Sequence, residues 1–385
     1  MGEIRKVLVA GGGIGGLSAS IAFAQKGVAV QLLEKRRDFR VPGVGLGQPA
    51  CALRRYHEFG VLEEILDTGF CYDHMSIFDP SRTLIVSHRF QMGGGAIPAF
   101  CALPRAALHD ILLRRAIALG VELRLGAQIG AHTGVAGADI RFDDGTDASY
   151  DLIAGFDGIR SSARSYIYGD MFGPRHSGYG AWRIQAERPA FVTGMEFLQG
   201  IRGKAGAIPI AKDRMYLFNI RPEPEGAMFP PDRMHLLWKE RLSQFGSYVA
   251  DIAADLNPSS SIVYGAIEPF IVPYPWNRGR VVIGGDAAHV IPPHLTAGAA
   301  MAVEDACALA RCVLSTGGTV EERLAHYGKT RFARNAFLSV FARDWLQAEQ
   351  SVSTPDELEA SKAEQSRNAD ARITVADRIL DSPDW

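Results

Sequence analysis

The feature that most constrains the fold of this chain is a glycine-rich turn near its start. Residues 5–10 include the apolar run Val7-Leu8-Val9-Ala10, which predicts a short buried strand. Three glycines then follow in the spacing G-x-G-x-x-G: Gly11, Gly13 and Gly16. A helical stretch over 17–26 and a second apolar run over 28–33 complete the unit. This order predicts two parallel strands joined by a helix, in a sheet that is covered on both faces.

There is a physical reason for a glycine at each of these three positions. Gly11 permits the tight turn, Gly13 lets the backbone approach a pyrophosphate, and Gly16 allows the helix to pack closely on the strand. The free N–H groups at the start of the helix attract phosphate. Glu34 ends the second strand, where a carboxylate binds a ribose 2′-OH and repels a 2′-phosphate. The unit therefore predicts a site for NAD or FAD, between which the turn itself does not decide, and disfavours NADP as the resident nucleotide.

The apolar pattern predicts a second lobe after the first sheet. Further strands of the first lobe are expected at 122–125, 139–142, 151–156 and 281–285, and helices at 50–59, at 104–119 and from Gly298. Four short strand-like runs, 180–185, 194–201, 206–210 and 215–220, predict an antiparallel sheet within 176–272. The last 50 or so residues read as helical and then polar, and we expect them to fray.

Length and composition are those of an ordinary globular protein. The 385 residues suit two co-folded units or one elaborated domain. Apolar residues make up 47% of the chain and charged residues 22%, which excludes disordered and fibrous classes. The net charge of −2 gives no reason to expect nucleic acid or an anionic membrane surface as a partner.

Cysteine usage and hydropathy indicate a cytoplasmic protein. The five cysteines are scattered and none forms a C-x-x-C pair, so we expect neither a disulfide framework nor a metal site. No stretch approaches 18 apolar residues, and the first apolar run leads directly into the glycine turn. We therefore expect neither a transmembrane helix nor a signal peptide.

Two motifs further along the chain place aspartates at strand ends. Asp157-Gly158 follows the strand expected over 151–156, and Gly285-Asp286 closes the one over 281–285. Ligands gather at the carboxyl ends of strands in open α/β sheets. Either aspartate alone could be a helix N-cap. Their joint occurrence with Glu34 indicates a nucleotide site.

In this order the three motifs resemble the fingerprints of the single-component FAD-dependent aromatic hydroxylases, the p-hydroxybenzoate hydroxylase-like family. The resemblance implies an α/β fold, with a Rossmann-type FAD-binding domain, an antiparallel-sheet substrate domain and C-terminal helices. We assign the FAD-binding domain to 1–175 and 273–330, the substrate domain to 176–272, and the C-terminal helical segment to 331–385.

The resemblance also implies which residues contact FAD. The loop over 43–47 is expected near the isoalloxazine, and the helix from Gly298 is expected to direct its N-terminus at the flavin. The expected contacts are Gly11, Gly13, Ile14, Gly15, Gly16, Glu34, Lys35, Arg36, Gly45, Leu46, Arg105, Asp157, Gly158, Gly285, Asp286, Pro293, Gly298 and Ala299. The run Leu295-Thr296-Ala297-Gly298 stands where many relatives have Gly-Gln-Gly, which leaves the subfamily open.

Enzymes of this family reduce FAD with NADH or NADPH, and the reduced flavin and O2 form a C4a-hydroperoxide that hydroxylates an electron-rich ring. The resemblance implies such a monooxygenase, acting on a small aromatic or N-heteroaromatic ring. Tyr216 resembles a tyrosine that some pyridine-ring hydroxylases use at the substrate. Arg183 could pair with a substrate carboxylate, and His294 could relay a proton. Further pocket candidates are Trp182, Arg214 and Asn219, whereas core positions are expected for Met215, Phe218, Phe270 and Trp276.

Other readings remain open at this point. A related flavoenzyme such as a reductase or epoxidase, or a non-catalytic flavin-binding protein, would carry the same nucleotide motifs. A second G-x-G-x-x-G unit is missing, which fits transient binding of the nicotinamide nucleotide in a groove. The sequence determines neither the substrate nor the choice of NADH or NADPH. A homodimer is a plausible assembly.

Overall fold

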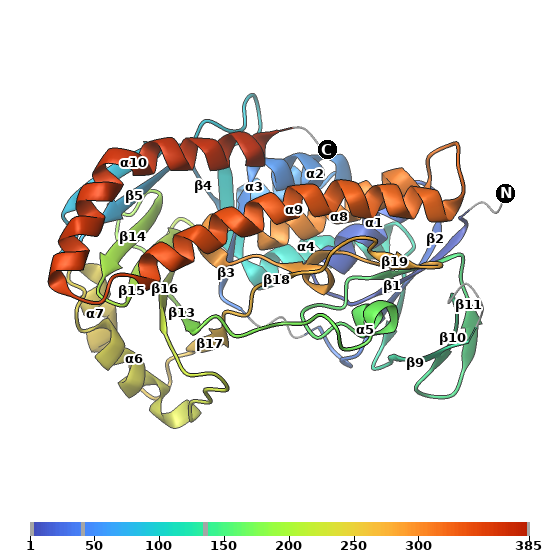
Figure 1. The fold of residues 1–385 in the computed structure, drawn as a ribbon, viewed down its shortest axis with the longest axis horizontal. Helices are drawn as coiled ribbons and strands as arrows, with labels where there is room; N and C mark the ends of the chain where they lie inside the picture. The colour runs from blue at the N-terminus through green and yellow to red at the C-terminus, as the bar shows by residue number, and fades with distance from the viewer. Residues whose placement is uncertain (1–3, 40–42, 134–137, 383–385) are drawn as a thin grey trace.

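The glycine turn lies at the centre of a six-stranded sheet in the computed structural model, which describes residues 4–39, 43–133 and 138–382 (Figure 1). The predicted first unit is confirmed as β1 (Lys6–Ala10), α1 (Ile14–Ala24) and β2 (Ala29–Glu34). The other strands are β8 (Glu122–Leu125), β12 (Leu152–Gly155), β19 (Asn277–Arg278) and β20 (Val281–Ile283). The order is β19-β20-β12-β1-β2-β8, parallel except for β19.

The apolar runs form central strands because both faces of this sheet are covered. Val7, Leu8 and Val9 of β1 have no exposed surface, nor have Leu152 and Ile153 of β12. The helix α1 packs against both α4 (Arg105–Ala118) and α8 (Gly298–Val313). The buried side chains of these strands and helices form the main hydrophobic core of the molecule.

A seven-stranded sheet forms the second lobe. Its strands are β5 (His74–Phe78), β6 (Leu84–Arg89), β13 (Tyr179–Glu187), β14 (Met195–Gly200), β15 (Gly203–Pro209), β16 (Arg214–Pro222) and β17 (Val263–Ala266), in the order β17-β13-β16-β15-β14-β5-β6. The four strands predicted between 180 and 220 are confirmed as β13 to β16. All neighbours are antiparallel except β14 and β5.

The positions of β5 and β6 differ from one part of the expected division of the chain into domains. Residues 74–89 fall inside the predicted FAD-binding segment 1–175, yet they extend the second sheet through the parallel pairing of β5 with β14. This pairing joins segments that are more than one hundred residues apart, so a local hydrophobic pattern does not reveal it.

The second sheet has one face toward its own helices and the other toward the first lobe. The outer face packs on α6 (Met234–Leu242) and α7 (Tyr248–Asp255) around a separate core that includes Trp182, Met215 and Trp238. Side chains alternate between the faces of a strand, so the neighbours of these residues face inward.

Smaller elements complete the fold. A three-stranded sheet has the order β3-β7-β4, with β3 (Gly45–Pro49), β7 (Phe100–Pro104) and β4 (Phe70–Tyr72). A second has the order β11-β10-β9, with β9 (Ile129–His132), β10 (Asp139–Phe142) and β11 (Asp147–Ser149). The pair β18 (Phe270–Ile271) and β21 (His289–Val290) and the helices α2 (Ala50–Phe59), α3 (Leu62–Thr68) and α5 (Ser162–Tyr168) complete this part.

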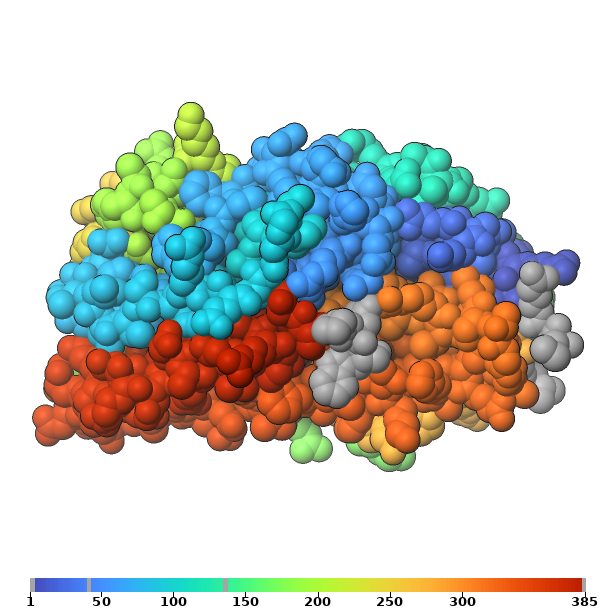
Figure 2. Space-filling model, turned by 90° about the horizontal axis from the view of Figure 1, so that it is seen from above, coloured from blue at the N-terminus to red at the C-terminus, as the bar shows by residue number. Residues whose placement is uncertain are grey.

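The C-terminal segment is helical up to residue 381, contrary to the expectation from its polarity that it would fray. The helix α9 (Val320–Gln350) crosses both lobes, and α10 (Pro355–Asp381) lies along the segment that carries β5 and β6 (Figure 2). Both ring nitrogens of the buried His88 are hydrogen bonded to carboxylates of α10, Asp370 at 2.7 Å and Asp377 at 2.9 Å. Within the described residues, no helix is long and apolar enough to cross a membrane.

Candidate active site

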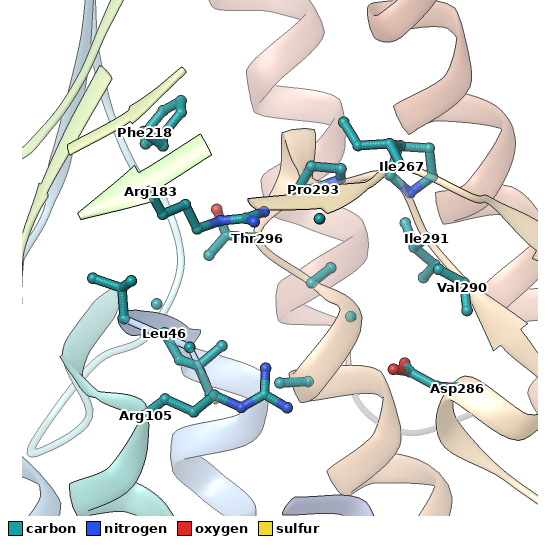
Figure 3. A pocket seen from close by; sticks show the side chains of 18 of the residues that line it. Leu46, Arg105, Arg183, Phe218, Ile267, Asp286, Val290, Ile291, Pro293 and Thr296 are labelled. Atoms are coloured by element: carbon teal, nitrogen blue, oxygen red, sulfur yellow. The ribbon is translucent and has the colours of Figure 1, made fainter. Parts of the chain in front are cut away.

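A cavity of about 530 Å³ lies between the carboxyl ends of the first sheet and the inner face of the second sheet (Figure 3). Gly13, Gly158 and Asp286 line it from the first lobe. Arg183 and Tyr216 line it from the second. The sequence therefore predicted residues from both walls of one cavity.

The glycine turn is closely packed on one side and open on the other. A Cβ on Gly16 would lie 1.8 Å from the carbonyl oxygen of Gly11, and a Cβ on Gly11 would lie 2.3 Å from the carbonyl oxygen of Phe156. Gly11 also has φ of +107°, which favours glycine. In contrast, a Cβ on Gly13 would meet no atom within 4 Å. This open position lines the cavity together with Ile14 and Gly15.

The start of α1 has free hydrogen-bond donors at the cavity. Gly13 is the N-cap residue and supplies no side-chain cap, and the first turn holds no acidic residue. Its N–H groups and partial positive charge are therefore available to an anion such as a pyrophosphate.

Glu34 lies at the turn rather than in the cavity wall. Its Oε2 accepts a hydrogen bond from the backbone N–H of Gly12 at 2.8 Å, and its Oε1 accepts one from that of Arg36 at 2.9 Å. Lys35 and Arg36 do not line the cavity either. These three expected cofactor contacts remain predictions. In contrast, the residues of the loop over 43–47, which is expected near the flavin, all line the cavity.

The two aspartates of the downstream motifs have different positions. The Oδ2 atom of Asp157 accepts hydrogen bonds from the backbone N–H groups of Ser162 and Ala163 at 2.7 and 3.1 Å, at the start of α5. Asp157 therefore supports the start of α5 and is absent from the cavity lining, and its expected contact with FAD remains a prediction. Its neighbour Gly158 does line the cavity.

Asp286 instead faces the cavity, and a buried carboxylate holds the turn that carries it. Asp305 of α8 accepts hydrogen bonds from the backbone N–H of Gly285 at 2.9 Å, from His289 at 2.6 Å and from Arg331 at 2.6 Å. These partners hold the pKa of Asp305 well below its usual range despite its burial. Burial raises the pKa of Asp286, opposed by the positive charges of His289 and Arg105.

Arg105 brings a cation to the cavity wall opposite Asp286 (Figure 3). It begins α4, and its Nε atom is buried with no hydrogen-bond partner within the described residues. A buried guanidinium donor without a partner is costly, so the site suits a ligand that carries an acceptor or a negative charge.

The proline loop and the start of α8 close the cavity between these groups. Pro293, Gly298 and Ala299 line it, as predicted. The helix starts after Ala297, which supplies no side-chain cap. The N–H groups of its first turn are therefore available at the cavity. Thr296, which sequence reasoning did not single out, also lines the cavity and has φ of +54°.

Arg183 and Tyr216 extend from neighbouring strands into the other half of the cavity. Arg183 of β13 projects toward the loop of Pro293 and Thr296 (Figure 3), and its guanidinium has no hydrogen bond or ion pair within the described residues. Burial lowers its pKa, a shift that the nearby Tyr216 opposes. Burial also raises the pKa of Tyr216 to about 12, so its hydroxyl keeps its proton at neutral pH.

His294 is one of the residues that line the cavity, and its imidazole contacts a carboxylate of α9. The side chain has no exposed surface, and its Nε2 lies 3.0 Å from Oε2 of Glu349 in α9. Lys204 of β15 bonds the same carboxylate at 2.5 Å. The ring thereby joins the proline loop to α9, and its role as a proton relay for the substrate remains a prediction. Burial and the charge of Lys204 lower its pKa.

Other pocket candidates point away because they occupy the wrong side or end of a strand. Trp182 belongs to the outer core and donates to Glu223. Asn219 donates to the backbone of Lys204 rather than into the cavity, and Arg214 is exposed at the end of β16. Conversely, Phe218, expected in the core, lines the cavity, together with Phe197, Lys204 and Ile267, which the sequence patterns had not indicated. Met215, Phe270 and Trp276 are buried in the cores, as expected.

The residues on the two walls suit an extended ligand with an anionic part and a planar part. The open glycine turn and two helix starts without side-chain caps offer N–H donors, and Arg105 offers a charge. The inner face of the second sheet adds Phe197, Tyr216 and Phe218. This donor set fits the pyrophosphate of FAD and leaves an aromatic chamber beyond it.

Comparison with known proteins agrees with this geometry. A family model described as "FAD binding domain" matches residues 5–339. The Bacillus subtilis (strain 168) protein YetM, whose name describes an FAD-dependent monooxygenase, is 33% identical over 86% of this chain and 90% of its own length. The 2-heptyl-3-hydroxy-4(1H)-quinolone synthase of Pseudomonas aeruginosa is 30% identical over 79% of this chain and 80% of its own.

Two further relatives have names that include urate or uric acid. The FAD-dependent urate hydroxylase of Mycolicibacterium vanbaalenii is 28% identical over 88% of this chain and 87% of its own. Among solved structures, Klebsiella pneumoniae HpxO complexed with FAD and uric acid superposes with a TM-score of 0.84, covering 98% of this chain and 97% of that one at 23% identity. The latter shows a common fold.

Proposed function

This chain belongs to the FAD binding domain family. We propose that the first-lobe half of its cavity binds the cofactor and the second-lobe half binds the substrate. The protein is an FAD-dependent monooxygenase that hydroxylates an aromatic or heteroaromatic ring. The bound flavin supplies the activation of O2, which amino-acid side chains cannot perform alone. The chain's own residues bind, orient and shield the reactants.

The first-lobe wall is the cofactor half of the cavity. The N–H groups of the glycine turn and Arg105 are suited to the pyrophosphate. Glu34, which lies at the turn and not in the wall, is our candidate for the ribose. Gly285 and Asp286 would hold the ribityl chain, supported from behind by Asp305. The start of α8 would place its positive end beside the flavin ring, where it favours negative charge on the reduced form.

The second-lobe wall is the substrate half, and the unpaired guanidinium of Arg183 is the observation that carries this assignment. A cation that is largely enclosed by protein and lacks a partner gains most from a negatively charged or carbonyl oxygen of the substrate. Tyr216 is a neutral donor or acceptor beside it. Phe197 and Phe218 would flank a planar ring and exclude water from the reacting carbon.

The substrate we propose is a fused nitrogen heteroaromatic with at least one oxo or hydroxy group on the ring, of the quinolone or purine type. The names of two relatives point this way, one to a quinolone and one to urate. Such rings carry an oxygen that is anionic or strongly polarised, which suits Arg183. A single-ring hydroxybenzoate would satisfy Arg183 through its carboxylate, and it is the alternative substrate class.

The reductant and the assembly stay at the level of prediction. We propose that NADH or NADPH binds transiently. A cytoplasmic location and a homodimer are the expectations from the sequence.

The decisive experiment combines cofactor and substrate. The purified protein would be loaded with FAD, and oxidation of NADH and NADPH would be followed with 4-hydroxyquinoline, uric acid, hydroxypyridines and hydroxybenzoates. We expect one fused heteroaromatic to accelerate oxidation and to gain one oxygen atom by mass spectrometry. Acceleration by hydroxybenzoates alone would overturn the proposed substrate class.

A further inference from the structure

Two of the five cysteines face each other across neighbouring strands, outside the cavity described above. Cys71 of β4 and Cys101 of β7 are direct partners in the antiparallel register, flanked by the pairs Phe70–Ala102 and Tyr72–Phe100. Directly opposed residues in antiparallel strands have Cα atoms about 4.5–5.5 Å apart. This separation falls within the range that a disulfide spans, about 4.4–6.8 Å.

The two thiols differ in their access to solvent. Cys71 is exposed on the edge strand, whereas Cys101 has no exposed surface. The Sγ atom of Cys101 lies 3.6 Å from the carbonyl oxygen of Ile65, and a Cβ on Gly69 would lie 2.6 Å from the same sulfur. A solvent oxidant therefore reaches Cys71 first, because the Cys101 thiol is shielded from solvent.

The two thiols also differ in their acidity, in the same sense. The neighbouring Cys101 thiol lowers the pKa of Cys71, although partial burial opposes the shift. The interaction with Cys71 and burial both raise the pKa of Cys101. The exposed sulfur thus has more thiolate character, which is the form that reacts with peroxides.

We propose that Cys71 and Cys101 form a reversible oxidation site, in which Cys71 is the attacking thiol and Cys101 the resolving thiol. The oxidant is hydrogen peroxide. This inference concerns a surface of the small β3-β7-β4 sheet and does not depend on the substrate or on the proposed function.

The reaction balances in two steps. The Cys71 thiolate attacks the peroxide O–O bond, so that an S–O bond forms, hydroxide leaves and the sulfur is oxidised to a sulfenic acid. The Cys101 sulfur then attacks the Cys71 sulfur; the S–S bond forms, the S–O bond breaks, and water leaves with the Cys101 proton. Two thiols and one hydrogen peroxide thereby give one disulfide and two water molecules.

The position of the pair indicates what oxidation would change. The strand β7 lies between β4 and β3, and Gly45, Leu46 and Gly47 of β3 line the cavity. The cross-link would tie the edge strand to the middle strand without entering the cavity. Bound FAD should therefore be retained by the oxidised protein.

The test treats the FAD-loaded protein with hydrogen peroxide and counts free thiols after denaturation. We expect five thiols to fall to three, with a peptide map that contains the Cys71–Cys101 disulfide, and dithiothreitol to restore all five. Cys101→Ser should stop at a Cys71 sulfenic acid that dimedone traps. Cys71→Ser, a change at an exposed position, should keep its four thiols.

A matched control is Cys312→Ser, which removes a half-buried cysteine from another part of the fold. It should form the same disulfide as the unaltered protein. The inference is overturned if the unaltered protein carries Cys71 to the sulfinic acid while Cys101 remains free. It is also overturned if the disulfide joins a different pair, or if Cys71→Ser loses two thiols as readily as the parent.

Discussion

The ring of Tyr216 packs directly against the backbone of Gly45, and this contact joins the two walls of the cavity. A Cβ placed on Gly45 would lie 2.5 Å from Cδ1 of Tyr216 and 2.8 Å from Cγ2 of Ile210. Gly45 belongs to β3 and Tyr216 to β16. The absence of a side chain at position 45 therefore determines how closely the tyrosine approaches the cofactor half.

We expect Gly45→Ala to displace the Tyr216 ring. The overpacked contact should lower the free energy of unfolding by about 1–3 kcal/mol. Displacement of a ring beside the substrate should lower substrate-stimulated NADH or NADPH oxidation by about 10- to 100-fold. Gly173→Ala is the matched control, because a Cβ there meets no atom within 4 Å. Equal turnover in the two variants would contradict the assigned contact.

Arg183→Met should weaken substrate binding with little effect on FAD content. The loss of a hydrogen bond to a charged group costs about 1.5–3 kcal/mol, which corresponds to roughly a 10- to 150-fold increase in KM. Arg214→Met, at the exposed end of the adjacent strand, makes the same chemical change outside the cavity and should leave KM unchanged. Steady-state kinetics and flavin absorbance measure both quantities. An unaltered KM in Arg183→Met would remove the guanidinium from the substrate site.

The cofactor half could be predicted well because its signals are local. The tight turn needs glycines at Gly11 and Gly16 whatever else the chain does, since a Cβ at either would collide with backbone. The strand before the turn and the helix after it are short-range consequences of the same sequence. Asp157 shows that a motif can predict the position of a residue without predicting where its side chain points. Its position after a strand was predicted, but the direction of its carboxylate depends on α5.

The substrate half was predicted less well because it depends on strand parity and distant pairing. Trp182 and Arg183 were both candidates, yet adjacent residues of a strand face opposite sides. The same alternation places Phe218 on the side of Tyr216, in the cavity. The link from His294 to Glu349 joins positions that no local pattern relates.

The buried carboxylate of Glu349 should be needed for stability. It accepts a hydrogen bond from Lys204 and contacts His294, and the interactions with these two residues lower its pKa to about 2 although burial opposes the shift. Glu349→Gln leaves the buried Lys204 ammonium without a counter-charge, which should cost about 3–5 kcal/mol in the free energy of unfolding. The double variant Lys204→Met, Glu349→Gln removes both charges and should recover much of that loss in urea unfolding. A double variant no more stable than Glu349→Gln would show that the ion pair does not account for the loss.

The last prediction concerns the pH dependence of stability through His109, which supports the glycine turn from α4. Its Nε2 lies 2.7 Å from the carbonyl oxygen of Gly12, and burial lowers its pKa below the ordinary 6.5, helped by the charge of Arg105 and opposed by the Gly12 hydrogen bond. As the pH falls below 6.5, the unfolded chain binds a proton that the folded chain resists, so stability is complete above that pH and is lost below it. His109→Gln can still donate to Gly12 but cannot titrate. Between pH 7 and pH 5 its unfolding temperature should therefore fall less steeply than that of the parent protein, whereas His57→Gln, at the exposed end of α2, should follow the parent. Parallel curves for all three proteins would show that His109 titrates alike in the folded and unfolded chain.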